Sequence, residues 1–227
     1  MGTVHVLDNP VWHALRGPHR PFAEGGERAV RYRPDVALFS ALPDEAVAED
    51  WPELAAVLGP NPLAVLFRRE TSPPEDWEEL FRIPTLQMIG ETVAGASSVL
   101  AKRLGDADVP EMLDLAKRTR PGPFVERTIE LGSYLGIREN GSLVAMAGER
   151  MRLPGWTEIS AVCTEESHRG RGLGTELVRS LVASIVGRGE TPFLHAVADN
   201  VGAIRLYEAL GFRTRHVFDV LVLRPRA

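Results

Sequence analysis

The segment His168-Arg169-Gly170-Arg171-Gly172-Leu173-Gly174 constrains the fold of this 227-residue chain more than any other feature. A strand-like run over residues 157–164 precedes it, and a helix-like stretch over residues 175–182 follows it. Glycine adopts backbone conformations that other residues avoid, so a glycine-rich turn suits a strand-to-helix connection. The first N–H groups of a helix have no partner and lie at its positive end. The sequence therefore predicts a mixed α/β domain in which this turn binds an anion.

Three phosphate-binding patterns can be compared with this turn. A nucleotide P-loop requires a Lys after its glycines, and none is present here. A dinucleotide fingerprint requires Gly-x-Gly-x-x-Gly and an acidic residue about 20 residues later. Gly170, Gly172 and Gly174 have a different spacing, although Glu190 could supply the acid. The third pattern, Arg-x-x-Gly-x-Gly, is filled when Arg169 precedes the last two of these glycines.

A second motif strengthens the third interpretation. After a strand-like run over residues 191–198 comes the pattern Asn200-x-x-Ala203-x-x-x-Tyr207-x-x-x-Gly211-Phe212. Together, the two motifs resemble the signatures of the GNAT superfamily of N-acetyltransferases. The resemblance extends from about residue 97 to the C-terminus.

The resemblance implies two parts in the chain. Residues 96–227 are expected to form a GNAT acetyltransferase domain with a mixed sheet. Residues 1–95 are expected to form an N-terminal α/β domain of unknown role, and one interpretation makes it a degenerate copy of the same fold, as in glycine-acyltransferase-like relatives.

Several local patterns predict individual elements. The apolar run 36–39 predicts a strand. Aspartates at positions 50 and 76, each followed three residues later by Glu, resemble capping boxes and predict two helix starts. Glu139-Asn140-Gly141 predicts a hairpin turn between strands over residues 134–138 and 143–151.

The family resemblance also implies a site for acetyl-CoA. Backbone N–H groups at residues 171–174 would hold the CoA pyrophosphate, and a main-chain N–H within 162–164 would polarise the thioester carbonyl. The strand and Arg169 are separated by about one residue more than is usual in the family, which leaves the donor within 162–164 open. The expected CoA-binding residues are Val162, Cys163, Thr164, Arg169, Gly170, Arg171, Gly172, Leu173, Gly174, Thr175, Asn200 and Tyr207.

Two residues are candidates for proton transfer. Tyr207 matches the family tyrosine that protonates the departing thiolate, and its alternative role is that of a core aromatic. Glu158 could accept a proton through water as the general base, or it could be a solvent-facing strand residue.

Other candidates also have structural alternatives. Arg169 either contributes charge to the anion site or forms a salt bridge to Glu165 or Glu166. Asn200 either contacts the CoA arm or caps the following helix. Cys163 is interpreted as a small apolar strand residue, and transfer is expected to be direct, without an acyl-cysteine.

Composition restricts the partners of the chain. The net charge of −5 disfavours nucleic acid binding. One cysteine, no signal-peptide pattern and no apolar run of about 20 residues favour a cytoplasmic protein without a membrane span. His168 and His195 lack the spacing of metal ligands, so no metal is expected. A homodimer would be common for the superfamily.

These observations lead to two functional hypotheses. The first is an acetyl-CoA-dependent N-acetyltransferase that acts on the primary amine of a small-molecule or peptide acceptor. The alternative is a non-catalytic acyl-CoA-binding sensor or regulatory module.

Overall fold

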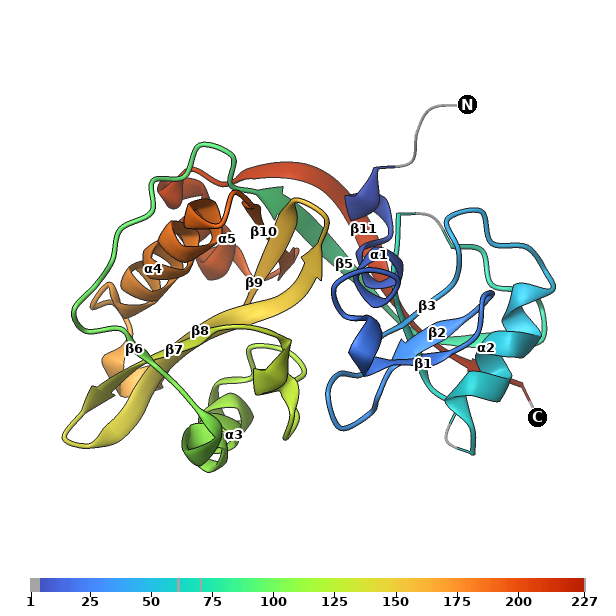
Figure 1. The fold of residues 1–227 in the computed structure, drawn as a ribbon, viewed down its shortest axis with the longest axis horizontal. Helices are drawn as coiled ribbons and strands as arrows, with labels where there is room; N and C mark the ends of the chain where they lie inside the picture. Colours follow the sequence, from blue (N-terminus) through green and yellow to red (C-terminus); the bar gives the residue numbers. More distant parts are fainter. Residues whose placement is uncertain (1–4, 61, 70, 227) are drawn as a thin grey trace.

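The computed structural model describes residues 5–60, 62–69 and 71–226. Their strands form one eleven-stranded sheet in the order β1-β2-β3-β4-β11-β5-β10-β9-β8-β7-β6 (Figure 1). The strands are β1 (Ala23–Gly25), β2 (Val30–Tyr32), β3 (Ser40–Ala41), β4 (Ala64–Phe67), β5 (Trp77–Ile89), β6 (Lys102–Arg103), β7 (Tyr134–Glu139), β8 (Ser142–Leu153), β9 (Trp156–Thr164), β10 (Thr191–Val197) and β11 (Arg213–Pro225). The mixed sheet agrees with the predicted α/β class.

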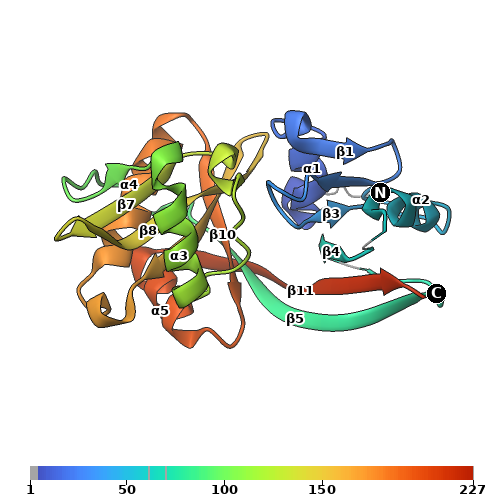
Figure 2. The same ribbon diagram turned by 90° about the horizontal axis from the view of Figure 1, so that it is seen from below.

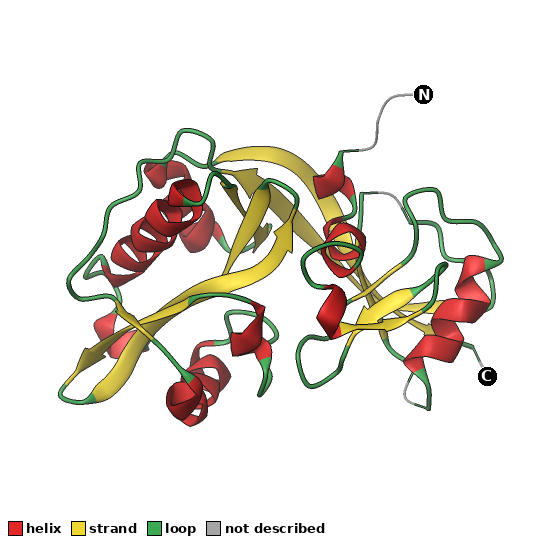
Figure 3. Ribbon diagram, in the orientation of Figure 1, coloured by secondary structure: helices red, strands yellow, loops and turns green. Residues whose placement is uncertain are grey.

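Helices cover this sheet in two groups, one at each end of the molecule. Figures 1 and 3 show α1 and α2 beside β1–β4, and α3, α4 and α5 beside β6–β10. We call the first group the N-terminal lobe and the second group the C-terminal lobe. The helices are α1 (Pro10–Leu15), α2 (Asp50–Leu58), α3 (Val109–Thr119), α4 (Leu173–Gly187) and α5 (Val201–Leu210).

Two long strands connect the two ends. β5 and β11 pair antiparallel, and Figure 2 shows them running from one lobe to the other. At one end β11 pairs with β4, and at the other end β5 pairs with β10. The domain boundary near residue 95 stays a prediction, since β5 precedes it and is paired with two strands that follow it.

Alternation along β8 explains how helices cover both faces of the sheet. Ala145 and Ala147 pack in a core with the buried face of α4 and with Tyr207 of α5. Met146, between them, packs in a second core with α3 and Cys163. Successive side chains of a strand point to opposite faces, so α3 lies on the face opposite α4 and α5.

The sheet opens between β9 and β10. These strands pair in parallel only from Trp156 to Ile159, opposite Thr191 to Leu194. Beyond that point β10 continues beside β5. β9 instead bulges against β8, with Ala161 in a left-handed conformation at φ 52°. A bulge increases the local bend and twist of its strand, so β9 turns away from β10.

Some of the local predictions are confirmed. The hairpin turn lies between β7 and β8, with Asn140 at φ 50° and Gly141 at φ 85°. Positive φ at both residues is the reason that this turn favours Asn-Gly. The helix start predicted at Asp50 is confirmed, but Glu49 rather than Asp50 is the N-cap of α2, and the expected capping box does not form.

Two local predictions are wrong. The run 36–39 lies in a turn and an irregular stretch between β2 and β3. The second expected helix start, at Asp76, instead precedes β5, whose first residue pairs with Pro225 at the end of β11. Trp77 is buried against Trp51, with ring centroids 5.1 Å apart, and this packing together with the long β ladder overrides the capping pattern.

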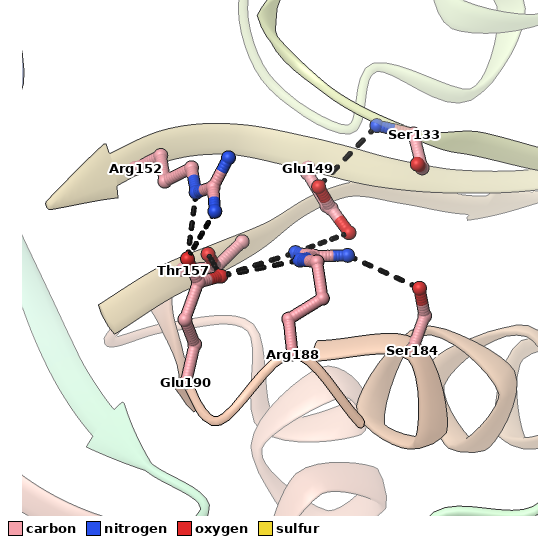
Figure 4. A network of polar contacts seen from close by, with 7 residues as sticks. All are labelled: Ser133, Glu149, Arg152, Thr157, Ser184, Arg188 and Glu190. Carbon is pink, nitrogen blue, oxygen red and sulfur yellow. Dashed lines mark hydrogen bonds and ion pairs between the residues drawn. The ribbon is translucent and has the colours of Figure 1, made fainter. Parts of the chain in front are cut away.

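A polar network holds the ends of β8 and β9 against α4 (Figure 4). Arg188, just after α4, binds Glu149 of β8 at 3.0 Å. Glu190 accepts hydrogen bonds from Thr157 of β9 at 2.6 Å and from Arg152 of β8 at 2.7 Å. Glu190 is therefore occupied as a structural residue in this network.

Gly148 offers a test of this packing. A Cβ on Gly148 would lie 2.2 Å from the ring of the buried Tyr134, whereas one on Gly187 at the end of α4 would meet no atom within 4 Å. Gly148→Ala should lower the free energy of unfolding by roughly 2 kcal/mol or more, because a packed core resists extra volume. Gly187→Ala should leave it equal or slightly higher. Urea unfolding of both variants would contradict this account if the two behaved alike.

Candidate active site

A cavity of about 610 Å³ lies where β9, α4 and α5 converge. It contains nearly all of the residues expected to contact CoA. Its lining comprises Thr119, Arg120, Pro121, Val162, Cys163, Thr164, His168, Arg169, Gly170, Gly172, Leu173, Gly174, Thr175, Asn200, Gly202, Ala203, Leu206 and Tyr207. We call this space the donor cavity.

The glycine-rich turn presents free backbone donors to the donor cavity. Gly170 and Gly172 have φ of 75° and 77°, a region that favours glycine. Gly172 is the N-cap of α4, and no side chain caps the helix there. The first intrahelical bond at this end comes from Glu176 N, at 3.1 Å to Gly172 O, so the N–H groups of residues 173–175 have no helical acceptor. This arrangement can bind an anionic group.

The arginines of the turn have different surroundings. Arg171 turns toward the β7–β8 hairpin and pairs with Glu139, so only its backbone is available to the cavity. Arg169 lines the cavity, and its Nε donates to Thr164 O at 3.3 Å. The alternative pairing with Glu165 is not formed, since Glu165 is paired with Arg118.

The bulge in β9 directs two backbone N–H groups into the gap between β9 and β10. Glu165 N donates to Val144 O of β8 at 2.8 Å. Neighbouring residues of a strand direct their N–H groups to opposite sides, so Thr164, and Val162 two residues before it, face away from β8. Val162 lines both the donor cavity and a second cavity described below.

Tyr207 lies at the junction of these two cavities. Its residue is 7% exposed, and burial, with a smaller contribution from Cys163, raises the pKa of its hydroxyl to about 12. In the described part of the chain, the buried side-chain polar atoms without a partner are Thr71 Oγ1 and Tyr134 Oη. The Tyr207 hydroxyl also has no hydrogen-bond partner among the described residues, but it is not one of these enclosed atoms, so it opens onto the cavities.

Cys163 is a buried strand residue, and Asn200 caps a helix, so both residues have the structural role that the sequence offered as an alternative. Cys163 is buried, and burial raises the pKa of its thiol, which disfavours the reactive thiolate. Asn200 Oδ1 accepts from Ala203 N at 3.2 Å and so caps α5. Asn200 also lines both cavities, and the cap leaves its amide nitrogen available.

A second cavity of about 340 Å³ extends from Tyr207 toward the N-terminal lobe. We call it the acceptor cavity. Its walls are mostly apolar and come from β4, β5, β8, β9, β10, β11 and α5, with Phe39 just before β3 and the loop after α3. They include Phe39, Val65, Phe67, Ile83, Ile159, Val197, Val220 and Val222.

Glu158 is buried beside the acceptor cavity, at 0% exposure, so the solvent-facing alternative is wrong. Arg150 binds it through Nε at 2.8 Å and Nη2 at 2.6 Å, and His195 Nδ1 lies 2.6 Å from Oε1. Burial opposes ionisation of Glu158, but the charge and hydrogen bonds of Arg150 and the bond from His195 outweigh it. They lower its pKa to about 2. A base role for Glu158 stays a prediction, and its carboxylate is committed to this ion pair.

Hydrogen bonds fix the protonation of His195. Arg215 Nη1 donates to Gln87 Oε1 at 2.9 Å, so the Gln87 amide nitrogen faces Leu7 O at 2.8 Å and His195 Nε2 at 3.1 Å. Because that nitrogen is a donor, His195 Nε2 accepts. The ring proton is therefore on Nδ1 and points to Glu158.

Three residues of this site could not be identified from the sequence pattern. Ala161, whose left-handed backbone forms the bulge, is a residue that seldom adopts positive φ. Arg150 is an ordinary strand arginine in the sequence, and only the paired strands place it against Glu158. Arg120 lines both cavities from the loop after α3.

Among the described residues, no three His, Cys, Asp or Glu side chains lie close enough together to hold a metal ion. None of the helices in the described ranges is both long and apolar enough to cross a bilayer.

Comparisons with known families and curated proteins identify relatives of part of the chain. The family model described as FR47-like protein matches residues 134–219. The N-alpha-acetyltransferase RimI of Mycobacterium tuberculosis is 35% identical over 83 residues, which cover 35% of this chain and 51% of RimI. Mycothiol acetyltransferase of Mycobacterium marinum is 36% identical over 72 residues, which cover 28% of this chain and 22% of that protein. The chain therefore spans about half or less of the length of these curated relatives.

Solved structures match the whole chain. A GNAT-family protein from Novosphingobium aromaticivorans is 38% identical, with a TM-score of 0.91, and the match covers 99% of this chain and 100% of that one. A GCN5-related N-acetyltransferase from Kribbella flavida is 19% identical with a TM-score of 0.59 and covers 96% of this chain and 95% of its own. The second likeness concerns the fold alone.

The buried Glu158 predicts a pH dependence of stability. Its pKa falls from 4.5 to about 2 on folding, so its contribution is complete above pH 4.5 and is lost as the pH falls toward 2. Between pH 6 and 3 it should remove about 2 kcal/mol from the free energy of unfolding. The double variant Glu158→Gln/Arg150→Met should lack this part of the slope. Equal slopes in urea unfolding of the two proteins would refute the assignment.

Proposed function

The chain belongs to the GNAT family of acetyltransferases, and we propose that it transfers an acetyl group from acetyl-CoA directly to the primary amine of an acceptor. The observation that carries the proposal is the meeting of two cavities at Val162 and Tyr207, beside the anion-binding turn. One relative named as an N-alpha-acetyltransferase and another named as an acetyltransferase support it. Small molecules and peptides both remain acceptor classes under this proposal, and a cytoplasmic location and a homodimer stay predictions.

The donor cavity supplies residues for each part of acetyl-CoA. The N–H groups of residues 173–175 would bind the pyrophosphate, with positive charge from Arg169. Gly172 allows the close approach, because a side chain there would project into open space at the start of α4. The N–H of Val162 would donate to the thioester carbonyl and stabilise the oxyanion as it develops.

Transfer then requires one bond to form and one to break. The neutral amine attacks the carbonyl carbon, the C–S bond breaks, and sulfur takes a proton from the Tyr207 hydroxyl. A phenol with a pKa of about 12 is a weak donor to a thiolate whose conjugate acid has a pKa of about 8.5, a difference of roughly 5 kcal/mol. The proton lost by the acetylated nitrogen returns to Tyr207, which offsets that cost and leaves an amide, a thiol and the original tyrosine.

The amine must lose its own proton before it attacks. An α-amine with a pKa near 8 costs roughly 1.4 kcal/mol to neutralise at pH 7, whereas a lysine amine near 10.4 costs about 4.6 kcal/mol. An acceptor with a low pKa can therefore react with water as the only base, which is consistent with the commitment of Glu158 to Arg150.

The alternative is a non-catalytic acyl-CoA sensor. The ion pair that holds Glu158 favours the sensor, because it leaves no free carboxylate base. The hydroxyl of Tyr207, which lies between the two cavities, favours the enzyme. A screen of primary amines that follows both CoA thiol release and the mass of the acetylated product separates the two. A sensor would bind acetyl-CoA and release no thiol above the rate of hydrolysis.

Tyr207→Phe tests the proton relay. The variant should lower kcat by roughly 10²-fold or more while the Kd for CoA changes little, because only the transferring proton is removed. Tyr134→Phe is a matched control, since the Tyr134 hydroxyl is buried without a partner and lines neither cavity. An unchanged kcat in Tyr207→Phe would remove this tyrosine from the mechanism.

A further inference from the structure

The end of the acceptor cavity beside Glu158 contains a hydrogen-bond donor that no described residue uses. The Arg150 side chain is 9% exposed and lines the cavity. Its Nε and Nη2 bind Glu158, while no partner is found for Nη1 among the described residues. Nη1 is not one of the buried unpartnered atoms, so it faces the cavity.

Two aromatic rings hold this guanidinium in place. Its central carbon lies 4.9 Å from the ring centroid of Phe39 and 5.5 Å from that of Phe67. Both rings also line the acceptor cavity. With its plane fixed by Glu158 on one side and these rings on another, Arg150 presents Nη1 in one direction.

This end of the cavity has no net charge. Glu158 neutralises Arg150 through two hydrogen bonds. His195 is held as the neutral ring, with Nδ1–H toward Glu158 and Nε2 accepting from Gln87. The cluster therefore offers a bound ligand a single N–H donor in apolar surroundings, and no excess positive charge.

The distance between the two ends sets the length of the ligand. The transfer point is at Val162, and Arg150 is bonded to Glu158, four residues earlier on β9. A strand rises about 3.3 Å per residue, so the separation along β9 is at most about 13 Å, and the bulge shortens it. The Ser160 hydroxyl lies on the wall between these points, and apolar side chains form most of the rest.

We propose that the acceptor is an elongated primary amine with an apolar body that ends in a neutral hydrogen-bond acceptor, a carbonyl or hydroxyl oxygen, bound by Arg150 Nη1. This inference rests on the proposed acetyl transfer and specifies its substrate class. The amine would lie near Tyr207, and the neutral oxygen would lie roughly 10 Å away.

Other amine classes fit this cavity less well. A polyamine or aminoglycoside would bury a second cation at this end, and no carboxylate is found among the described residues that line the cavity to pair with it. A carboxylate at the far end would place a net negative charge in a neutral, apolar environment, where desolvation is costly. A purely aliphatic end would leave Nη1 without water or a partner.

Matched eight-carbon amines test the far end of the acceptor directly. The set is 8-aminooctanamide, octylamine, 8-aminooctanoate and 1,8-diaminooctane, with 4-aminobutanamide as the short analogue. Thiol release by the wild-type protein should give the highest kcat/KM with 8-aminooctanamide, at least tenfold above each of the others. Preference for the diamine, for the carboxylate or for the short amide would overturn the inference.

Arg150→Lys provides the matched variant. Lysine keeps a cation beside Glu158 but cannot present a second planar nitrogen to the cavity. The ratio of kcat/KM for 8-aminooctanamide to that for octylamine should fall from at least tenfold to about one. An unchanged ratio would show that Arg150 does not bind the neutral oxygen of the acceptor.

Titration of CoA separates this inference from the proposed function. CoA binding with no preference for 8-aminooctanamide contradicts the substrate class alone. Failure of the wild-type protein to bind CoA, or to acetylate any amine in a broad screen, contradicts the proposed function itself.

Discussion

The candidate site depends on the separation of β9 from β10 after Ile159. Parallel pairing ends there, β10 continues with β5, and the bulge at Ala161 turns β9 away. The wedge that results is what leaves the N–H groups of Val162 and Thr164 without a neighbouring strand. Both cavities open into it, and Tyr207 stands where they meet. A continuous β9–β10 ladder would close this space and satisfy those donors.

The long pair of strands β5 and β11 forms a further wall of the acceptor cavity. Both strands reach into the N-terminal lobe, so Phe39 and Phe67 of that lobe contact Arg150 of the C-terminal lobe. The N-terminal lobe thus contributes directly to the acceptor cavity. Glu149 follows the strand alternation and points to the face of β8 opposite Arg150. There it joins Arg188 and Glu190 in the network that connects the end of β8 and the start of β9 to the C-terminal end of α4.

Much of the fold and of the lining of the donor cavity could be predicted from the sequence because those parts depend on local chemistry. Glycines with positive φ, such as Gly172, and a hairpin turn at Asn140-Gly141 are determined over a few residues. Tertiary contacts decide the rest. The capping pattern at Asp76 gave the wrong element because burial of Trp77 and pairing with β11 dominate that segment. The solvent-facing alternative for Glu158 is wrong, and the sequence could not exclude it because only the β8–β9 pairing brings Arg150 to this carboxylate.

The proposed acetyl transfer requires that the turn at the start of α4 binds CoA. The most direct measurement is thermal unfolding with acetyl-CoA, CoA and NAD in parallel. A ligand at 100 times its dissociation constant stabilises the folded protein by about 2.7 kcal/mol, which is roughly 5–10 °C in Tm for a chain of this size. We expect such a shift with both CoA species and none with NAD. No shift with either CoA species, at concentrations well above micromolar, would contradict the proposed acetyl transfer.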